Sequence, residues 1–216
     1  MGEQGSVSKA IRMARASAKG GFHLFWGLVV STVISTVGTV LVARLLSPTE
    51  YGLFTIALMA PNLFILFRDW GVNSAMIKYT AQYVSENKIA NVRSILVAGL
   101  LFELVLGLSL SFISFLLSGF LATNIFQRPD ITPLVQIASF TIFAGALQTA
   151  AQSAFAGYEK MEFNSIAMTS LSALKTVLAP LLVIIGLGAF GAILGATLAL
   201  VIAGLISILI LYLALY

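Results

Sequence analysis

Long apolar runs constrain this chain more than any other feature. A helix that crosses the hydrocarbon core of a bilayer needs about 20 mostly apolar residues, and six runs along the 216-residue sequence are close to that length. They are continuous rather than alternating, and open strands would leave backbone groups unpaired in lipid, so helices are favoured over a barrel. The sequence therefore predicts an all-α, polytopic membrane bundle of six transmembrane helices, at residues 21–46, 51–67, 95–120, 133–156, 163–187 and 189–215.

Composition excludes several classes of function. Hydrophobic residues make up 59% of the chain and charged residues 9%, against about 45–50% and about 25% in soluble domains. The chain has no cysteine and one histidine, His23, which excludes thiolate and multi-histidine metal sites. No phosphate-binding loop or nucleophile motif is present. We therefore expect neither an enzyme nor a cofactor or metal site.

The basic residues indicate topology. One side holds an amino-terminal segment, 1–20, with four basic residues, the connection between the second and third predicted helices with Arg68, Lys78, Lys88 and Arg93, and Lys160 between the fourth and fifth. The opposite side holds only Arg44 and Arg128. This bias predicts a cell-membrane protein with both termini in the cytoplasm. It also argues against nucleic acid as a partner, because the basic residues are not interleaved with aromatic residues on one face.

Two of these basic segments are candidates for contact with membrane lipids. In the connection 70–92, Met76, Tyr79 and Tyr83 recur at helical spacing, which predicts a cytoplasmic helix at the headgroup surface. The segment 1–20 is either a second such helix, attracted to anionic lipid, or a disordered basic tail that only fixes orientation.

Local signals predict how the helices are joined. In the stretch ARLLSPTEYGLF, Ser47 is placed to cap a helix that starts at Pro48, with Glu50 in its first turn. In RPDITP, either Asp130 or Thr132 is a plausible cap ahead of the next proline. The glycine-rich sequence GLGAFG predicts a turn between the fifth and sixth helices.

Two ionisable residues fall at membrane depth, where each costs at least about 2.5–3.5 kcal/mol and is a candidate for function. Lys175 lies about 18 Å into the fifth predicted helix and Glu103 about 12 Å into the third. One interpretation is that the two pair across a helix interface. The other is that Lys175 faces a water-filled cavity and attracts an anionic substrate, while Glu103 tunes it or binds a coupling cation.

Other polar residues are weaker candidates. Arg68 falls at the cytoplasmic end of the second predicted helix, where we expect an interfacial anchor, with substrate contact as the alternative. Gln148 and Gln152 in the fourth helix are expected mainly to support helix packing through hydrogen bonds. Pro61 and Pro180 interrupt their helices, either as hinges or as simple kinks.

The hairpin and the residues after it resemble a known family. Its pattern has an arginine that ends the first helix, a hairpin of the type Pro-x-Glu-Tyr-Gly, and an acidic residue and glycine before an alanine-apolar-apolar-basic run. The matching positions here are Arg44, Pro48, Glu50, Tyr51, Gly52, Asp69, Gly71 and the AMIK of Ala75 to Lys78. The later AFAGYEKMEFNSI is similar to the family's segment between helices four and five. The chain is therefore similar to polysaccharide biosynthesis proteins, the Wzx-type lipid-linked oligosaccharide flippases of the multidrug/oligosaccharidyl-lipid/polysaccharide exporter superfamily.

This resemblance implies a carrier that moves a sugar linked to a polyprenyl phosphate or pyrophosphate across the cytoplasmic membrane by alternating access. It also implies two lobes of six or seven helices around a central cavity, with a cationic lining that suits the substrate's phosphate. Lys175 fits that lining by its chemistry, and Arg44 matches a family position at the outer mouth. Six predicted helices correspond to one lobe, so we expect pairing with a second lobe or a second copy.

Two alternatives stay open. One is an exporter of the same superfamily that moves cationic drugs on an ion gradient, for which a carboxylate such as Glu103 is needed. The other is a non-transporting membrane scaffold for glycan assembly. Both alternatives agree with the fold that the sequence predicts.

Overall fold

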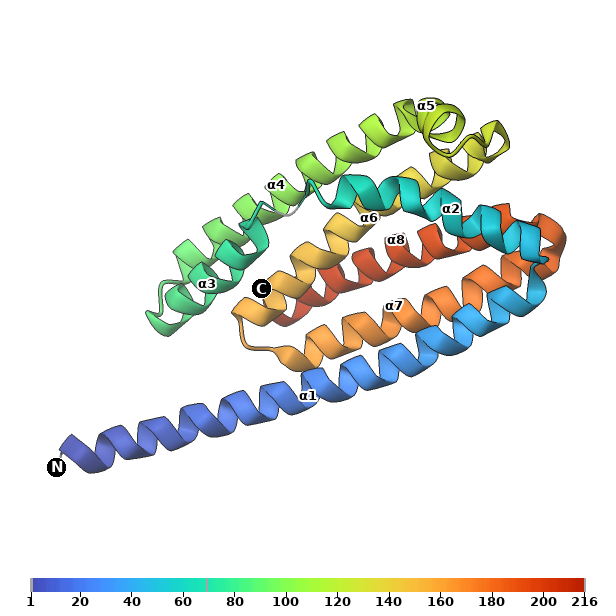
Figure 1. The fold of residues 1–216 in the computed structure, drawn as a ribbon. Coiled ribbons are helices and arrows are strands. Elements are labelled where there is room, and N and C mark those ends of the chain that lie inside the picture. Colours follow the sequence, from blue (N-terminus) through green and yellow to red (C-terminus); the bar gives the residue numbers. More distant parts are fainter. Residues whose placement is uncertain (1, 69, 216) are drawn as a thin grey trace.

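The computed structural model describes the backbone of residues 2–68 and 70–215, and side chains from residue 20 to 213 except at position 69. Within this part of the chain every regular element is a helix, so the all-α prediction is confirmed (Figure 1). The elements are α1 (Gly2–Leu45), α2 (Pro48–Ile65), α3 (Val72–Ser85), α4 (Ile89–Leu116), α5 (Ser118–Phe120), η1 (Leu121–Ile125), η2 (Pro129–Ile131), α6 (Thr132–Gly157), α7 (Met161–Leu182), η3 (Val183–Leu187) and α8 (Gly188–Leu215).

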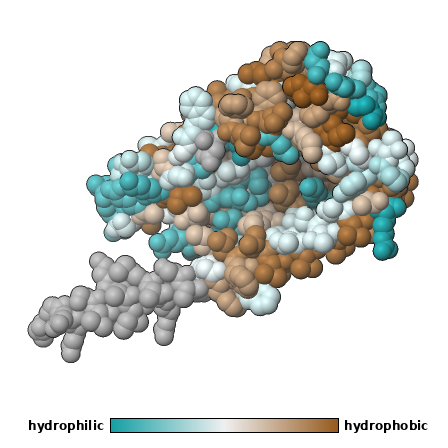
Figure 2. Space-filling view, in the orientation of Figure 1, coloured by the Kyte–Doolittle hydropathy of each residue, from teal (hydrophilic) through white to brown (hydrophobic). Residues whose placement is uncertain are grey.

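Four stretches among the described residues are long and apolar enough to cross a membrane: Gly20–Leu45, Ile89–Leu116, Pro129–Gly157 and Met161–Leu213. The last contains both α7 and α8, which fold back against each other (Figure 1). α2 is not among the four, so the count of six crossings stays a prediction. Hydrophobic side chains cover much of the surface in Figure 2, while hydrophilic ones gather over the tip of the α3–α4 hairpin, where Glu86 and Lys88 are exposed.

From Gly2 onward, the basic amino-terminal segment continues into the first membrane-length stretch as a single helix, α1. The positions of Lys9, Arg12, Arg15 and Lys19 side chains lie outside the described residues, as does Asp69. The prediction of lipid contact for this segment is therefore not tested by the fold.

The hairpin between α1 and α2 has the predicted cap. The Ser47 side chain accepts a hydrogen bond from the Glu50 backbone N–H at 3.3 Å, and the Glu50 carboxylate accepts one from the Ser47 backbone N–H at 3.2 Å. Pro48 occupies the first turn. The two reciprocal bonds satisfy backbone donors that a helix start otherwise leaves unpaired.

The cap predicted for the start of α6, just ahead of Pro133, is wrong. Thr132 is the first residue of α6, Ile131 holds the cap position, and no side chain caps the helix. Asp130 instead accepts two hydrogen bonds from Arg128, at 3.0 and 2.8 Å. A bidentate bond to a guanidinium is stronger than a bond to a backbone N–H, which explains why the carboxylate turns away from the helix.

Glycines hold α1 and α7 close together along their length. The two helices run parallel, since Gly27 contacts Ser165 near one end and Gly38 contacts Thr176 further along, and neither glycine has room for a Cβ. The Thr176 hydroxyl donates to the Ile34 carbonyl at 2.9 Å across the seam. Close backbone approach at small residues, supplemented by hydroxyl bonds, is how helices associate in lipid.

The second predicted helix corresponds to α2, and α3 falls within the predicted connection 70–92. α2 ends at Ile65, and after a break α3 runs along α4 and α6 (Figure 1). Met76 of α3 fills the space beside Gly99 of α4, and Thr80 that beside Gly157 of α6. The helix predicted within 70–92 is present, but its buried side packs into the bundle because these glycines leave room for it, so it is not a separate surface element.

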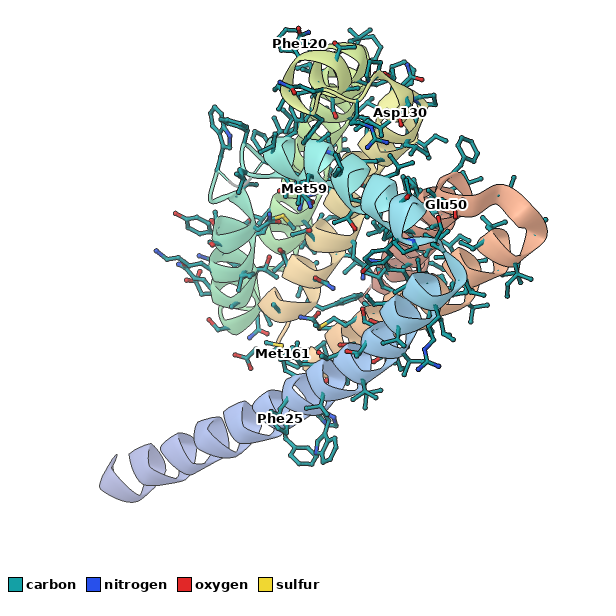
Figure 3. All side chains as sticks on the ribbon, turned by 45° about the vertical axis from the view of Figure 1, so that its right-hand side comes forward. Phe25, Glu50, Met59, Phe120, Asp130 and Met161 are labelled. Atoms are coloured by element: carbon teal, nitrogen blue, oxygen red, sulfur yellow. The ribbon has the colours of Figure 1, made fainter. Side chains whose placement is uncertain are left out.

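The α7–α8 connection contains the predicted glycine turn. Gly186 and Gly188 have φ of 99° and 52°, values that glycine adopts without the strain of a Cβ. The Glu50 carboxylate contacts Gly188, and Figure 3 shows Glu50 beside this turn. The α1–α2 hairpin and the α7–α8 turn therefore lie at the same end of the bundle.

Candidate functional site

One group of polar side chains is buried where the α2–α3 break meets α4 and α6. We call it the Arg68–Glu103 cluster; it consists of Arg68, Asn73, Glu103, Thr149 and Ser153. The Glu103 side chain is fully buried, with its Oε2 3.6 Å from the Arg68 Nε. The Asn73 amide donates to Glu103 Oε1 at 2.8 Å and accepts from the Ser153 hydroxyl at 3.1 Å. The carboxylate is thus compensated by a guanidinium and an amide.

Arg68 follows α2 by three residues, so it lies at the end of that helix, as the sequence predicted. Its guanidinium donates to the Thr149 hydroxyl at 2.8 Å and to the Ile142 carbonyl at 3.3 Å, both on α6. It is buried, and Glu103 lies near the middle of the 28-residue α4. The side chain thus bonds inside the bundle and is not the exposed anchor that we expected, because the chain continues along α4 and α6 after Arg68.

Lys175 lies apart from this cluster, so the predicted alternative of a Lys175–Glu103 pair is wrong. Its side chain is exposed and lines a cavity of about 100 Å³ between α1, α2 and α7, which we call the lysine cavity. Ser35 and Thr39 of α1, Tyr51 of α2 and Thr176 of α7 also line it. Hydroxyl-bearing residues from three helices therefore line the same cavity as Lys175.

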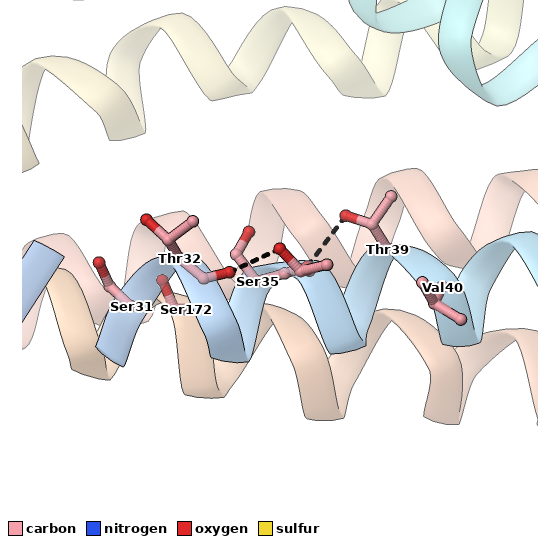
Figure 4. A pocket seen from close by; sticks show the side chains of 7 residues that line it. Ser31, Thr32, Ser35, Thr39, Val40 and Ser172 are labelled. Carbon is pink, nitrogen blue, oxygen red and sulfur yellow. Dashed lines mark hydrogen bonds between the residues drawn. The ribbon is translucent and has the colours of Figure 1, made fainter. Parts of the chain in front are cut away.

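A larger hollow of about 390 Å³ adjoins the lysine cavity and shares Ser35 and Thr39 with it; we call it the hydroxyl cleft. All but one of its lining residues carry a hydroxyl group (Figure 4), and they are Ser31, Thr32, Ser35, Thr36, Thr39, Val40 and Ser172. Two threonine hydroxyls donate to carbonyls of their own helix, Thr36 to Thr32 and Thr39 to Ser35. Their oxygens keep acceptor capacity toward the cleft.

These two cavities have a distinct chemistry. None of the residues that line either one is an aspartate or a glutamate. A cation without an adjacent carboxylate, beside many hydroxyl groups, suits an anionic ligand that also carries hydroxyls, because charge-assisted bonds to an ammonium are the stronger kind. Among the described residues no group of three or more histidines, cysteines or carboxylates could hold a metal ion.

The remaining predicted residues lie elsewhere. Gln148 is buried and joins three helices: its amide donates to the Ala167 carbonyl at 3.2 Å, and its oxygen accepts from the Ser207 hydroxyl at 3.1 Å. Gln152 is half-buried on α6 and Arg44 is exposed in the last turn of α1; neither lines the lysine cavity or the hydroxyl cleft. The structure thus brings Arg68 and Glu103 together and leaves Lys175 and Arg44 separate from them.

Sequence reasoning missed two parts of these sites. Asn73 and Thr149 carry no signal of their own, because their roles depend on which helices meet. The hydroxyl cleft did carry one: Thr32, Ser35, Thr36 and Thr39 recur three and four residues apart, which places them on one face of a helix.

Solved structures show the same fold at low sequence identity. The chain is similar to an outward-facing multidrug resistance MATE family transporter of the MOP superfamily (TM-score 0.73, 18% identity, covering 92% of this chain and 45% of that one). It is also similar to a mutant MATE transporter (TM-score 0.75, 19% identity, covering 92% of this chain and 45% of that one). A third similar structure is a MOP superfamily transporter from Pyrococcus furiosus, described as having a binding pocket of reversed polarity (TM-score 0.71, 18% identity, covering 92% of this chain and 45% of that one). The chain spans about 45% of the length of these structures, which corresponds to one lobe.

The sequence comparison identifies the family. No curated protein matched the chain, but the pattern of the family described as polysaccharide biosynthesis protein matches residues 17–216. Membrane-length helices and a transporter fold agree with that match. The chain therefore belongs to the polysaccharide biosynthesis protein family, as a multi-pass membrane protein with the fold of one MOP exporter lobe.

Proposed function

We propose that this chain is the amino-terminal lobe of an exporter that moves a lipid-linked oligosaccharide across the cytoplasmic membrane by alternating access. The substrate is a sugar chain on a polyprenyl phosphate or pyrophosphate, so it combines an anionic group with many hydroxyls. The observation that carries the proposal is Lys175, exposed in a cavity without carboxylates that opens beside a cleft of hydroxyl groups.

The energetics of the membrane support a functional Lys175. A lysine at membrane depth costs at least about 2.5–3.5 kcal/mol unless it meets water, a counter-charge or a ligand. Lys175 has neither Glu103 beside it nor any other carboxylate in the lining of its cavity. A water-filled cavity that receives a phosphate group would offset the cost. The hydroxyls of the adjoining cleft then contact the first sugars.

The proposal includes a topology. α1, α4, α6, α7 and α8 each make one crossing, and α2 followed by α3 makes the sixth. Six crossings put both termini on the same side of the membrane, and the basic residues of segment 1–20 assign that side to the cytoplasm. The face formed by α1, α2 and α7 then opens toward a second lobe or a second copy of the chain. Alternating access needs two such bundles that rock about a site between them.

A second candidate is an exporter of cationic drugs, because the similar solved structures include multidrug transporters. Such a substrate requires an anionic site. Glu103 is fully buried and pairs with Arg68 and Asn73, so its charge is already compensated. The cavity that is open carries the opposite sign. These observations favour the anionic, lipid-linked substrate, and the scaffold alternative gives no reason for an exposed lysine in a cavity.

The test is glycan analysis of a deletion strain complemented with the natural full-length gene and its variants. Lys175→Ala is expected to lower the amount of exported glycan about ten- to hundredfold, because a hydrogen bond to a charged group contributes about 1.5–3 kcal/mol. Lys175→Arg should keep most of it. Lys160→Ala, which removes an exposed lysine from the α6–α7 turn, is the matched control and should have no effect.

Protein level in the membrane is measured in parallel. Normal level with lipid-linked glycan accumulating on the cytoplasmic leaflet supports the proposal. Normal glycan export by Lys175→Ala contradicts it, and so does a loss of protein level that accounts for the whole defect. Normal glycan together with new drug sensitivity in the deletion strain assigns the protein to the drug exporters instead.

A further inference from the structure

The lysine cavity has two kinds of lining. Lys175 supplies an ammonium group, and Ser35, Thr39 and Thr176 carry hydroxyl groups. The rest of the lining is aromatic, aliphatic or glycine, and consists of Gly38, Val42, Tyr51, Phe54, Leu58 and Ala179. Tyr51, Phe54 and Leu58 all come from α2, and we call these three residues the α2 wall. One cavity thus places a cation opposite a largely apolar surface.

The α2 wall is fixed by the core behind it. The rings of Tyr51 and Phe54 have their centroids 6.0 Å apart, at an angle of 40°. Phe54 and Leu58 also pack against a core cluster in which the fully buried Ala57 and Ala60 meet residues of α6 and α8. Side chains that are already held in place lose little conformational freedom when a ligand contacts them. The wall is therefore a preorganised surface.

Size and position divide the lysine cavity from the hydroxyl cleft. The cavity volume of about 100 Å³ equals the share of about three water molecules in the liquid, at about 30 Å³ each, so it suits a phosphate and a few carbons rather than a sugar chain. The cleft is larger, at about 390 Å³. On α1 the two hollows extend from Ser31, in the cleft, to Val42, in the cavity, which is about 16 Å of helix.

A phosphate that enters the cavity brings the first carbons of its lipid with it. These carbons leave the bilayer, and in a water-filled cavity they would be exposed to water. Each methylene group withdrawn from water changes an affinity about fourfold. Contact with the α2 wall removes this penalty. An ammonium group alone gives no such selection, because it attracts any phosphate of the same charge.

We propose that the lysine cavity recognises the junction between the phosphate and the isoprenoid chain of the substrate, with Lys175 at the phosphate and the α2 wall against the adjoining carbons. This assignment rests on the proposed function, which takes Lys175 as the phosphate site. Tyr51, Phe54 and Leu58 then determine specificity, since they favour lipid-linked sugars over soluble sugar phosphates. Tyr51 belongs to the Pro-x-Glu-Tyr-Gly hairpin, so the hairpin contributes to the site as well as to the turn.

Protection of a cysteine in the cavity measures this recognition. The 216 residues contain no cysteine, and Ser35 lines both hollows, so Ser35→Cys serves as the reporter. A maleimide labels it in the purified full-length protein, and peptide mass analysis locates the label. The probes are inorganic phosphate, methyl phosphate and dimethylallyl phosphate. Each is titrated for the concentration that halves the labelling rate.

Dimethylallyl phosphate is expected to protect at a concentration at least about tenfold below that of methyl phosphate, which corresponds to about two methylene groups withdrawn from water. Leu58→Asn makes the wall polar and should abolish most of this preference, while protection by methyl phosphate stays. Met59→Asn is the matched control, because Met59 is the next residue on α2, is exposed and does not line the cavity. It should keep the preference.

Lys175→Ala tests the phosphate site separately. It should weaken protection by all three probes about ten- to hundredfold, because it removes a hydrogen bond to a charged group. The preference between methyl and dimethylallyl phosphate is a ratio within one variant. It therefore does not depend on how much of that variant is folded.

The outcomes separate this inference from the proposed function. Equal protection by methyl and dimethylallyl phosphate overturns the inference, and so does a preference that Leu58→Asn leaves intact or that Met59→Asn also abolishes. Unchanged phosphate protection in Lys175→Ala, with a preference that still depends on Leu58, rejects the proposed function and keeps the α2 wall as an apolar subsite. No protection by any probe, with the reporter labelled normally, contradicts both.

Discussion

The Arg68–Glu103 cluster and the lysine cavity both contain charged side chains, but their surroundings are opposite. In the cluster a buried carboxylate meets a guanidinium and an amide, and the charges are closed off by α4 and α6. The lysine cavity holds an exposed lysine, and hydroxyl-bearing residues from three helices line it. A buried pair that is complete contributes to structure, and breaking it leaves a costly unpaired charge. An open charge contributes little to stability and stays available for a ligand.

The largest expected effect follows from this difference. Arg68→Ala leaves Glu103 buried without its cation, which should cost about 3–5 kcal/mol and remove most folded protein from the membrane. Lys175→Ala, at an exposed position, should change stability by no more than about 0.5 kcal/mol. Thermal unfolding of the purified protein in detergent, followed by the fraction that stays monodisperse, measures both. Similar losses in the two variants would remove the distinction between the sites.

A smaller effect is expected at the helix seam beside the lysine cavity. Gly38→Val places a branched side chain against Thr176, and overpacking of this kind costs about 1–3 kcal/mol. Gly52→Ala on α2 is the matched control: it has open space and removes a glycine from a helix, so it should be neutral or stabilising by up to about 1 kcal/mol. The same unfolding assay applies. A neutral Gly38→Val variant would contradict the close contact of α1 and α7 at this glycine.

The smallest effect concerns an ion pair with the same chemistry as the buried one but open to its surroundings. The Arg128 guanidinium donates two hydrogen bonds to the Asp130 carboxylate, and the two side chains are 43% and 52% exposed. Because an exposed pair contributes little to stability, Arg128→Ala should leave stability at pH 7 unchanged. A large loss at neutral pH would show that exposure is a poor guide to a charge's role.

Much of the fold was predictable because its signals are local. The Ser47 and Glu50 cap, the break after α2 and the glycine turn before α8 all follow from residues a few positions apart. The cap of α6 was not, since Asp130 had two possible partners nearby and bonds to Arg128. The packing of α3 against α4 and α6 was also missed, because the room that Gly99 and Gly157 make for it depends on which helices meet.

The candidate site also has a part that the sequence predicts and a part that it does not. The sequence marked Lys175 and Glu103 by their depth, and it held the periodic hydroxyls of α1. It did not show that Glu103 belongs to Arg68 or that Lys175 opens into a cavity. Helix periodicity gives the spacing of residues on one helix, but a partner on another helix depends on how far that helix is rotated and shifted.

By itself, then, the sequence determined the membrane environment, the helical class and the local turns. The length of an apolar run and the residues of a helix cap both lie within one continuous segment of chain. Only the tertiary structure decided which charge is closed and which is open. That outcome depends on where glycines let the helices approach, and it set Arg68 against Glu103 while leaving Lys175 exposed in its cavity.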